Sequence, residues 1–388
     1  MHFHVRNRRP IRWLPVGLFL LSLMLLSGCV KPETGPDATT TPAAIETAQA
    51  TGNSGESTAG TATIEDYFPV NTGAYYEYSG NNANYATQKY YISYVSDDGS
   101  RFQRHISVGQ SGTTEVLEKK NGTLKVIYAQ RFFCPENALR ETPNADIIAL
   151  QEPLKKGQTW KQDESTSCEI TDMNKQVTTP YGTFDTMEVS STYESGMSQK
   201  DYYAKGVGLV QTIYSKEGAD DIIVSLNRVE DNAADTVAVA LFSPSSKSGK
   251  LELMPGNTVT LEANGNAPDA LLPLLKSKPG AEYLPLLSDN VKILSFDPGR
   301  NNNLMTLNLS KEFYDYIGGL GPAEEKLVLQ GLADTFGNFY WVGNFTLQVE
   351  GKYYESGHMA LSDSEYLTVE VPGDNFNNGE GGDSSSQK

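Results

Sequence analysis

The 388-residue chain is poor in the residues that build metal and redox centres, because it has only three cysteines and four histidines. It is also short of basic charge. The 31 Lys and Arg residues stand against 48 Asp and Glu residues, which gives a net charge of −17. A surface of this sign repels phosphate, and the basic residues gather only within the first twelve positions. The composition therefore argues against nucleic-acid binding.

The chain also lacks a long hydrophobic run. Residues 14–26 are apolar, but thirteen residues are too few to span a bilayer, which takes about 20. Arg6, Arg8, Arg9 and Arg12 precede this run. A basic start followed by a short apolar stretch is typical of a secretory signal peptide, which we place at residues 1–28.

The end of that stretch, Leu26-Ser27-Gly28-Cys29, resembles the lipobox of bacterial lipoproteins. The resemblance implies cleavage before Cys29 and acylation of its sulfur. Two or three acyl chains would then anchor the protein to the extracytoplasmic side of the cell membrane. The alternative is an ordinary cleaved signal peptide followed by a cysteine with no lipid.

Two segments have compositions that cannot bury enough apolar surface to fold. Residues 29–63 are predicted to be a disordered tether, since 25 of the 34 residues from Val30 to Thr63 are Ala, Thr, Gly, Ser or Pro. Residues 372–388, rich in Gly, Asn, Asp and Ser, are predicted to be a disordered tail. The two folded parts lie between these segments.

Residues 64–230 are predicted to form an antiparallel all-β domain, because short alternating runs recur between Gly, Asn and Asp turns. The runs are 74–79, 88–96, 102–108, 113–119, 123–129, 183–192, 199–204, 209–215 and 222–229. Asp98-Gly99 and Asn121-Gly122 are hairpin signals. A sandwich and an open, curved sheet both fit this spacing.

Three phrases in this part resemble a β-rich domain of bacterial extracytoplasmic lipoproteins. They are PLKKGQTW at 153–160, TPYGTF at 179–184 and DYYAKGVGLV at 201–210. The resemblance implies a fold and no function.

Residues 236–371 are predicted to form a small mixed α/β domain, after a short polar linker at 231–235. Strands are expected at 237–242, 258–261 and 345–349, and a hairpin at 291–296 and 304–309. One helix is expected to start with Ser310 as its N-cap. Another should start at Pro322, with an apolar face that ends before Gly337. That face comprises Leu329, Leu332, Ala333 and Phe336.

This second part resembles a GerMN domain, a module of sporulation and spore germination. The matching stretches are ALLPLLK at 270–276, LPLLSDNVKILS at 284–295, LMTLNLSKEF at 304–313 and LQVEGK at 347–352. Asn308 stands where the family usually has Asp, and Pro273 interrupts the first helix. The resemblance implies an α+β, multidomain protein whose second domain works in protein–protein assembly.

Cys134 and Cys168 are the cysteines that remain beyond the anchor, and outside the cytoplasm such a pair is expected to form a disulfide. Two separate buried cysteines are the alternative. His105 and His358 lie in different predicted domains. His105 alternates with Phe102, Arg104 and Ile106 on a predicted strand, and we expect a structural role for it.

No catalytic motif is present, and we predict no catalytic, cofactor-binding or metal-binding residues. The acid pairs Asp97-Asp98, Asp220-Asp221 and Glu324-Glu325 sit in predicted turns and at a helix start, where local contacts explain them. Adjacent tyrosines on a strand point to opposite faces, so one of each pair should be exposed. The candidates for an exposed binding surface are Tyr76, Tyr78, Tyr91, Tyr203 and Tyr354.

These observations favour a non-enzymatic, lipid-anchored lipoprotein that assembles envelope or sporulation proteins. Two alternatives stay open. One is a lipoprotein that binds cell-wall glycan or a small ligand through the exposed tyrosines. The other is a cell-wall hydrolase, which predicts a cleft with paired carboxylates of different pKa.

Overall fold

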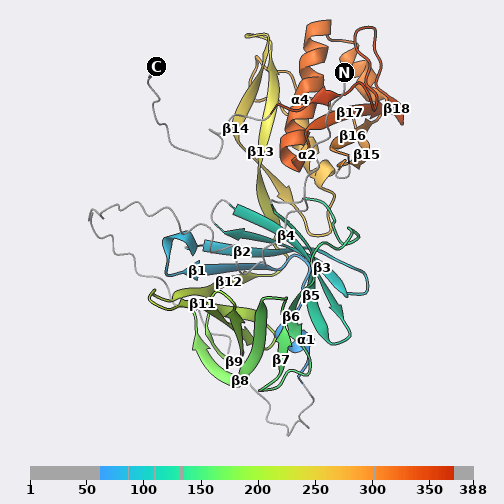
Figure 1. The fold of residues 1–388 in the computed structure, drawn as a ribbon. Coiled ribbons are helices and arrows are strands. Elements are labelled where there is room, and N and C mark those ends of the chain that lie inside the picture. Colours follow the sequence, from blue (N-terminus) through green and yellow to red (C-terminus); the bar gives the residue numbers. More distant parts are fainter. Residues whose placement is uncertain (1–61, 86, 109–110, 132–134, 300–301, 371–388) are drawn as a thin grey trace, which may run out of the picture.

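The computed structural model describes residues 62–370, except 86, 109–110, 132–134 and 300–301. Most of these residues lie in strands (Figure 1). The strands form a 12-stranded antiparallel sheet, a two-stranded sheet and a five-stranded sheet. Within this part of the chain, no helix is long and apolar enough to cross a membrane.

The 12-stranded sheet follows the chain from strand to strand, and its first and last strands also pair. Its order is β6-β5-β4-β3-β2-β1-β12-β11-β10-β9-β8-β7. The bounds are β1 (Tyr75–Gly80), β2 (Thr87–Val95), β3 (Arg101–Val108), β4 (Ser111–Lys120), β5 (Thr123–Arg131), β6 (Ile147–Gln151), β7 (Thr159–Lys161), β8 (Thr166–Thr178), β9 (Thr183–Tyr193), β10 (Met197–Ala204), β11 (Gly208–Lys216) and β12 (Ile222–Glu230). The sheet is nearly closed, because Ile148 N donates to Gln162 O (3.0 Å) and Trp160 Nε1 donates to Ile148 O (3.1 Å).

The nine strands predicted between residues 74 and 229 are confirmed, and they belong to one curved sheet rather than a sandwich. Both hairpin signals are also confirmed. Gly99 has φ 67°, and Asn121 and Gly122 have φ 52° and 70°, which is the left-handed region that Asn and Gly tolerate. The prediction missed β6, β7 and β8.

The short helices α1 (Ile64–Tyr67) and η2 (Ala83–Tyr85) accompany this sheet. Ile64 and Tyr67 share a core cluster with residues from both halves of the sheet, including Phe102 and Val210. Gly206 N donates to Asp66 O (2.8 Å) in the turn between β10 and β11. The folded part therefore begins on the enclosed, inner face of the sheet.

The C-terminal part, residues 235–370, has a separate core cluster that spans residues 239–369. Its elements are β13 (Asp235–Ser245), β14 (Lys250–Leu261), α2 (Ala267–Lys276), β15 (Ile293–Asp297), β16 (Leu304–Leu309), α3 (Glu312–Ile317), α4 (Pro322–Tyr340), β17 (Asn344–Val349), β18 (Lys352–Tyr353) and β19 (Leu367–Thr368). β16 and β17 pair in parallel, and α4 is the crossover between them. The molecule is mostly β, with its longer helices in this part.

The predicted face of α4 is confirmed, since Leu329, Leu332, Ala333 and Phe336 are all fully buried. The helix starts at Pro322 as predicted but continues through Gly337 to Tyr340. Ser310 is not the N-cap of α3, because Lys311 occupies that position. The Ser310 hydroxyl instead accepts a hydrogen bond from Lys292 N (3.0 Å).

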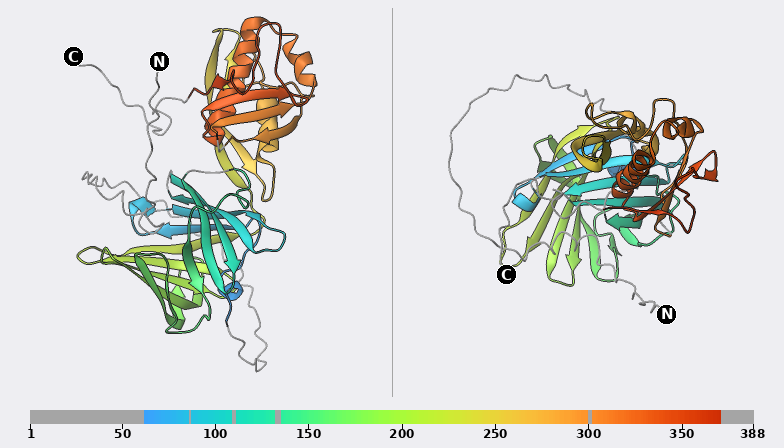
Figure 2. Two further views of the ribbon diagram at one scale, coloured as in Figure 1. Left: turned by 45° about the vertical axis from the view of Figure 1, so that its right-hand side comes forward. Right: turned by 90° about the horizontal axis from the view of Figure 1, so that it is seen from above.

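The C-terminal part docks on the outer face of the large sheet, where β1 stops short of the end of β2 (Figures 1 and 2). The β13–β14 hairpin base continues the pairing. Asn264 N donates to Ser93 O (2.8 Å), and Val95 N donates to Asn264 Oδ1 (3.1 Å). Tyr91 donates its hydroxyl to Ala233 O (3.1 Å), and Tyr94 donates to Gly265 O (2.9 Å). We call this set of contacts the joint.

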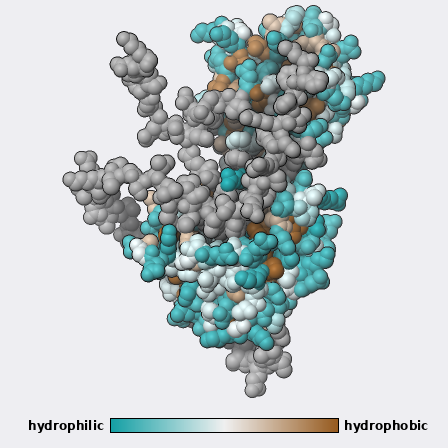
Figure 3. All heavy atoms as spheres, in the orientation of Figure 1, coloured by the Kyte–Doolittle hydropathy of each residue, from teal (hydrophilic) through white to brown (hydrophobic). Residues whose placement is uncertain are grey.

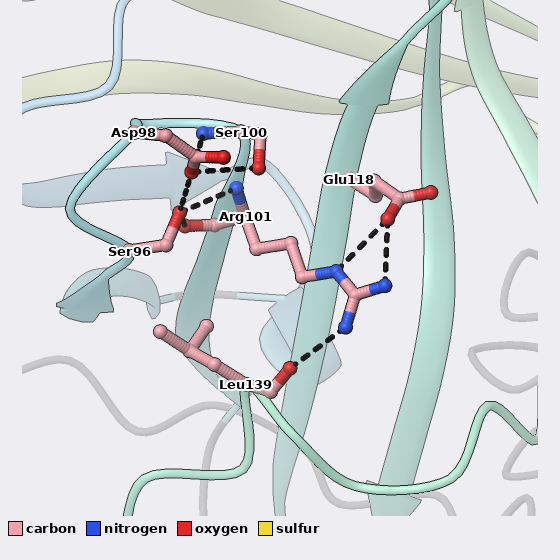
Figure 4. Close-up of polar contacts among 6 residues, drawn as sticks. All are labelled: Ser96, Asp98, Ser100, Arg101, Glu118 and Leu139. Carbon is pink, nitrogen blue, oxygen red and sulfur yellow. Dashed lines mark hydrogen bonds and ion pairs between the residues drawn. The ribbon is translucent and has the colours of Figure 1, made fainter.

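The outer face beside the joint is also covered by residues 135–139. Arg101 binds Glu118 Oε1 through Nε (2.9 Å) and Nη2 (2.7 Å), and its Nη1 donates to Leu139 O at 3.1 Å (Figure 4). Tyr94 also donates to Pro135 O (3.1 Å). One tyrosine hydroxyl therefore bridges this segment and the C-terminal part.

We expect Tyr94→Phe to lower the free energy of unfolding by about 1–2 kcal/mol, because the carbonyl oxygens of Pro135 and Gly265 lose the one hydroxyl proton that they share in a largely buried place. Urea denaturation measures this, and hydrogen exchange at Asn264 N should become faster. Tyr181→Phe, at a side chain that is 47% exposed, is the control. Equal stability of the two variants would contradict a structural role for the Tyr94 hydroxyl.

Candidate functional site

Cys29, the predicted lipidation site, and Cys134 lie outside the described residues. Acylation and the disulfide therefore stay predictions. Cys168 is buried on β8, with its Sγ 3.2 Å from Ser191 Oγ. Burial raises the pKa of the Cys168 thiol to about 11, so as a free thiol it would be a poor nucleophile at neutral pH.

The five tyrosines predicted to form an exposed surface are all buried, so that prediction is wrong. They are Tyr76, Tyr78, Tyr91, Tyr203 and Tyr354. Tyr78 donates its hydroxyl to Leu209 O (2.8 Å), and Tyr354 donates to Glu325 Oε1 (2.8 Å). Burial raises the pKa of Tyr76 and of Tyr91 to about 12. Their hydroxyls therefore serve the interior of the protein.

The inner face of the large sheet holds a charged group that the sequence analysis did not select. Arg104 on β3 forms an ion pair with Glu115 on β4 (Nη2 to Oε2, 2.8 Å). Its guanidinium carbon lies 5.3 Å from the centre of the Tyr90 ring, a cation–π distance. The Glu115 side chain has no exposed surface, and its Oε1 has no hydrogen-bond partner among the residues described.

A second acid, Asp201 on β10, lies near this cation. Its Oδ1 accepts a hydrogen bond from Thr212 (2.6 Å) and its Oδ2 accepts one from Gln199 (2.8 Å). Burial raises the pKa of Asp201 to about 6, although these hydrogen bonds and the charge of Arg104 oppose the rise. Both carboxylate oxygens are engaged by the protein, which leaves the group poorly placed to act on a substrate.

A pocket opens beside Arg104 on the inner face. Its lining is aromatic and aliphatic apart from Arg104, and it contains no carboxylate. The lining residues are Phe68, Pro69, Tyr76, Tyr78, Tyr90, Ile92, Phe102, Arg104, Val207, Gly208 and Leu209. Its volume is about 30 Å³, which is room for about two or three water molecules.

His105 has the structural surroundings that we predicted, on the same face of β3 as Gln103. Its Nε2 lies 3.3 Å from Gln103 Nε2, and its Nδ1 lies 3.3 Å from Asp235 Oδ2 at the start of β13. The buried ring thus belongs to the joint. His358 is exposed in the C-terminal part, and no group of three or more metal-ligating side chains occurs among residues 62–370 as described.

Asp98 and Glu324 make the local contacts predicted for the acid pairs, whereas the partners of Glu325 are distant in sequence. Asp98 Oδ1 accepts from Ser96 Oγ (2.7 Å), Ser100 N (3.0 Å) and Ser100 Oγ (2.7 Å) in the β2–β3 turn (Figure 4). These hydrogen bonds lower the pKa of Asp98 to about 2. Glu324 accepts from Gly321 N (3.1 Å) at the start of α4, and Glu325 binds Ser356 Oγ (2.6 Å).

Exposed large hydrophobic side chains concentrate in the C-terminal part. Of six among the described residues, five lie there and one, Tyr181, lies in the large sheet. The five are Leu294, Tyr314, Trp341, Tyr353 and Tyr366. In the view of Figure 3, hydrophobic residues likewise gather on the C-terminal part, with a smaller group on the sheet below.

Comparison with known proteins identifies the C-terminal part. Residues 239–355 match the family model named Germane and described as sporulation and spore germination. The C-terminal part contains a Germane domain. The Germane domain covers α2, α3, α4 and β15 to β18, so it includes the helices that the sequence analysis expected.

Solved structures show weaker similarity. The first GerMN domain of the sporulation protein GerM from Bacillus subtilis is 16% identical and has a TM-score of 0.26, covering 34% of this chain and 97% of that one. A protein from Bacteroides fragilis, described as exported and of YmcC-like fold, is 12% identical with a TM-score of 0.28 over 42% and 99%. A protein described as a lipoprotein from Clostridium perfringens is 17% identical with a TM-score of 0.22 over 35% and 93%. No curated protein matches the chain.

We expect the free energy of unfolding to fall as pH rises from about 4 to 7, partly because of Asp201. The folded state favours the protonated acid, since the pKa is raised from 3.8 to about 6, and it therefore binds the proton more tightly than the unfolded chain. In Asp201→Asn the free energy of unfolding should fall by about 1–2 kcal/mol less between pH 4 and pH 7. Denaturation at several pH values measures it.

Asp220→Asn, in an exposed turn, is the matched control and should leave the slope unchanged. Burial also raises the pKa of Asp334 on α4 to about 6. The pH dependence of stability that comes from Asp334 should therefore persist in both variants. An unchanged slope in Asp201→Asn would contradict the burial of this carboxyl group.

We expect the unreduced, denatured chain to contain no free thiol at Cys134 and Cys168. The bond would close a loop of about 35 residues and stabilise the fold by up to about 3.8 kcal/mol in the chain-entropy model. Thiol titration of Cys29→Ser protein measures this. Two titratable thiols would refute the disulfide and leave Cys168 as the buried thiol next to Ser191.

Proposed function

We propose that the protein is a non-enzymatic lipoprotein, anchored through Cys29 on the extracytoplasmic side of the cell membrane, that assembles with other proteins in sporulation, germination or the cell envelope. The Germane match supports the biological setting. The resemblance of residues 26–29 to a lipobox supports the anchor. The concentration of exposed hydrophobic side chains on the C-terminal part carries the assembly role.

The arrangement of the two parts suits such a role. The described chain starts at α1, on the inner face of the large sheet, whereas the C-terminal part docks on the outer face (Figure 1). With the anchor attached to the N-terminal side, the large sheet would lie between the tether and the Germane domain. The hydrogen bonds of the joint would hold that arrangement of the two parts.

Trp341 is the strongest candidate for a partner contact. It follows the last residue of α4 with φ 57°, and its side chain is 61% exposed. This left-handed conformation costs a residue other than glycine about 1–2 kcal/mol. A bulky aromatic residue held exposed at such a cost points to a function for its ring, and Trp is enriched at the centres of protein interfaces.

The other candidate functions have less support. The glycan or small-ligand alternative depended on five tyrosines that are buried, and the pocket beside Arg104 has room for only about two or three water molecules. The hydrolase alternative required paired carboxylates in a cleft. The lining of this pocket contains none, and the carboxylate oxygens of Asp201 are both occupied.

The test is cross-linking in living cells, with capture of the tagged protein from vegetative and sporulating cultures. We expect envelope or sporulation proteins to be captured, and at least a tenfold loss of them in a Trp341→Asn, Tyr353→Ala variant. Asn is chosen at position 341 because it tolerates positive φ, so the ring is removed without added backbone strain.

Tyr181→Ala is the matched control, because Tyr181 is a similarly exposed tyrosine on the large sheet. It should leave capture unchanged. Cys29→Ser should release the protein into the medium. Capture of no protein in either culture, or hydrolysis of cell wall by the purified chain, would contradict the proposal.

A further inference from the structure

Helix α4 carries three polar side chains on one stripe, Gln330, Asp334 and Asn338, each four residues from the next. All three bind the main chain of residues 367–370, which we call the strap. Gln330 Nε2 donates to Thr368 O (2.9 Å), and Asn338 Nδ2 donates to Glu370 O (3.0 Å). Asp334 Oδ1 accepts from Glu370 N (2.8 Å).

The opposite edge of the strap is also paired. β19, which contains its first two residues, lies antiparallel to β17, and Val369 N donates to Gly343 O (2.9 Å). The strap is therefore an extended peptide held between a strand edge and a polar stripe on a helix. Main-chain hydrogen bonds of this kind hold a peptide whatever its side chains are, and specificity comes from pockets for alternate side chains.

One such pocket is present, and it fits a small β-branched residue. Val369 is 8% exposed and lies over Gly337. A Cβ atom at position 337 would lie 2.3 and 2.6 Å from the two Val369 methyl carbons, so only glycine leaves room for this side chain. We call the pocket, the polar stripe and the edge of β17 the groove.

The groove and the strap belong to different stretches of the chain. All the groove residues fall within the Germane match at 239–355, whereas the strap lies beyond it. The eleven residues between Glu355 and Leu367 are mostly exposed, with Leu361 as the one fully buried side chain among them. Leu361 is held in the core and its N donates to Tyr354 O (2.9 Å), so residues 362–366 are the part free to extend. Five extended residues span about 17 Å, enough to reach an adjoining molecule.

One polar atom of the groove lacks a hydrogen-bond partner where the strap docks. Asp334 is fully buried, and its Oδ2 has no hydrogen-bond partner among the residues described. Release of the strap returns this oxygen to water, which offsets part of the contacts that are lost. A docked segment with this built-in cost is suited to exchange.

We propose that the groove is a docking site for the strap of a second copy of this chain, so that straps exchange between two Germane domains and link the molecules. The closed form fills the groove from its own chain. The exchanged form makes the same hydrogen bonds between two molecules, and it needs no new contacts. This proposal is independent of the envelope partners proposed above.

The test mixes two variants of the secreted chain, each with Cys29→Ser to exclude lipid. Val369→Asp places a charge where the pocket is apolar, so this variant has an open groove and a strap that cannot dock. Gly337→Leu fills the pocket, so that variant has an undocked strap of normal sequence and a groove that cannot accept one. Each variant alone should be monomeric by light scattering and native mass spectrometry, and an equimolar mixture should form a 1:1 dimer of twice the mass.

Gln330→Ala with Asn338→Ala replaces Gly337→Leu if that variant does not fold, because both amides are only partly buried. Lys326→Ala, exposed one turn earlier on α4, is the control and should form no dimer with Val369→Asp. Monomers in every mixture of folded variants would overturn the proposal. Binding of a synthetic 364–370 peptide to Val369→Asp without dimerisation of the mixture would also overturn it. The groove would then accept a free strap peptide but not the strap of a second copy.

Discussion

The main chain of β2 needs hydrogen-bond partners along its whole length, and β1 with the two residues before it supplies them only as far as Ile92. The hairpin base at Asn264 completes the row, and it brings the C-terminal part onto the outer face of the sheet. This contact explains why His105 and Gln103 can be buried on a face that would otherwise be wet. The orientation of the Germane domain thus follows from the unequal lengths of two neighbouring strands.

The inner face of the same sheet meets a different requirement. A charge taken out of water must be paired, and Arg104 is matched by Glu115 and by the face of Tyr90. The tyrosines around it fill the enclosed space, and Tyr78 donates its hydroxyl to Leu209 O. The result is a packed interior with little free volume. Such an interior makes the large sheet a rigid support for the C-terminal part. Most of the exposed large hydrophobic side chains lie on that C-terminal part.

Strands with regular alternation could be predicted from the sequence, and strands with irregular pairing could not. β8 was missed because its pairing with β9 shifts near Ile170 and again near Asp172, which breaks the period of two. α4 and its buried face were predicted because Pro322 and four apolar residues mark them. The tyrosine choice failed because alternation tells which residues share a face but not what covers each face. Tyr91 faces the joint, and in the pair at 353–354 the exposed ring is Tyr353. Arg104 could have been noticed as a charge between Phe102 and Ile106, because its partners Glu115 and Tyr90 lie on the neighbouring strands β4 and β2.

The pairing of β1 with β12 has a consequence for how the protein is made. Tyr75 lies opposite Glu230, so the sheet cannot be completed until 150 residues have followed its first strand. A chain that crosses a membrane from its N-terminus presents β1 outside well before β12 arrives, and contacts so distant in sequence form slowly. During that interval one edge of β1 is open to any other extended chain. In the exported protein proposed above, completion of the sheet therefore competes with aggregation, and β1 is the segment that a chaperone would protect.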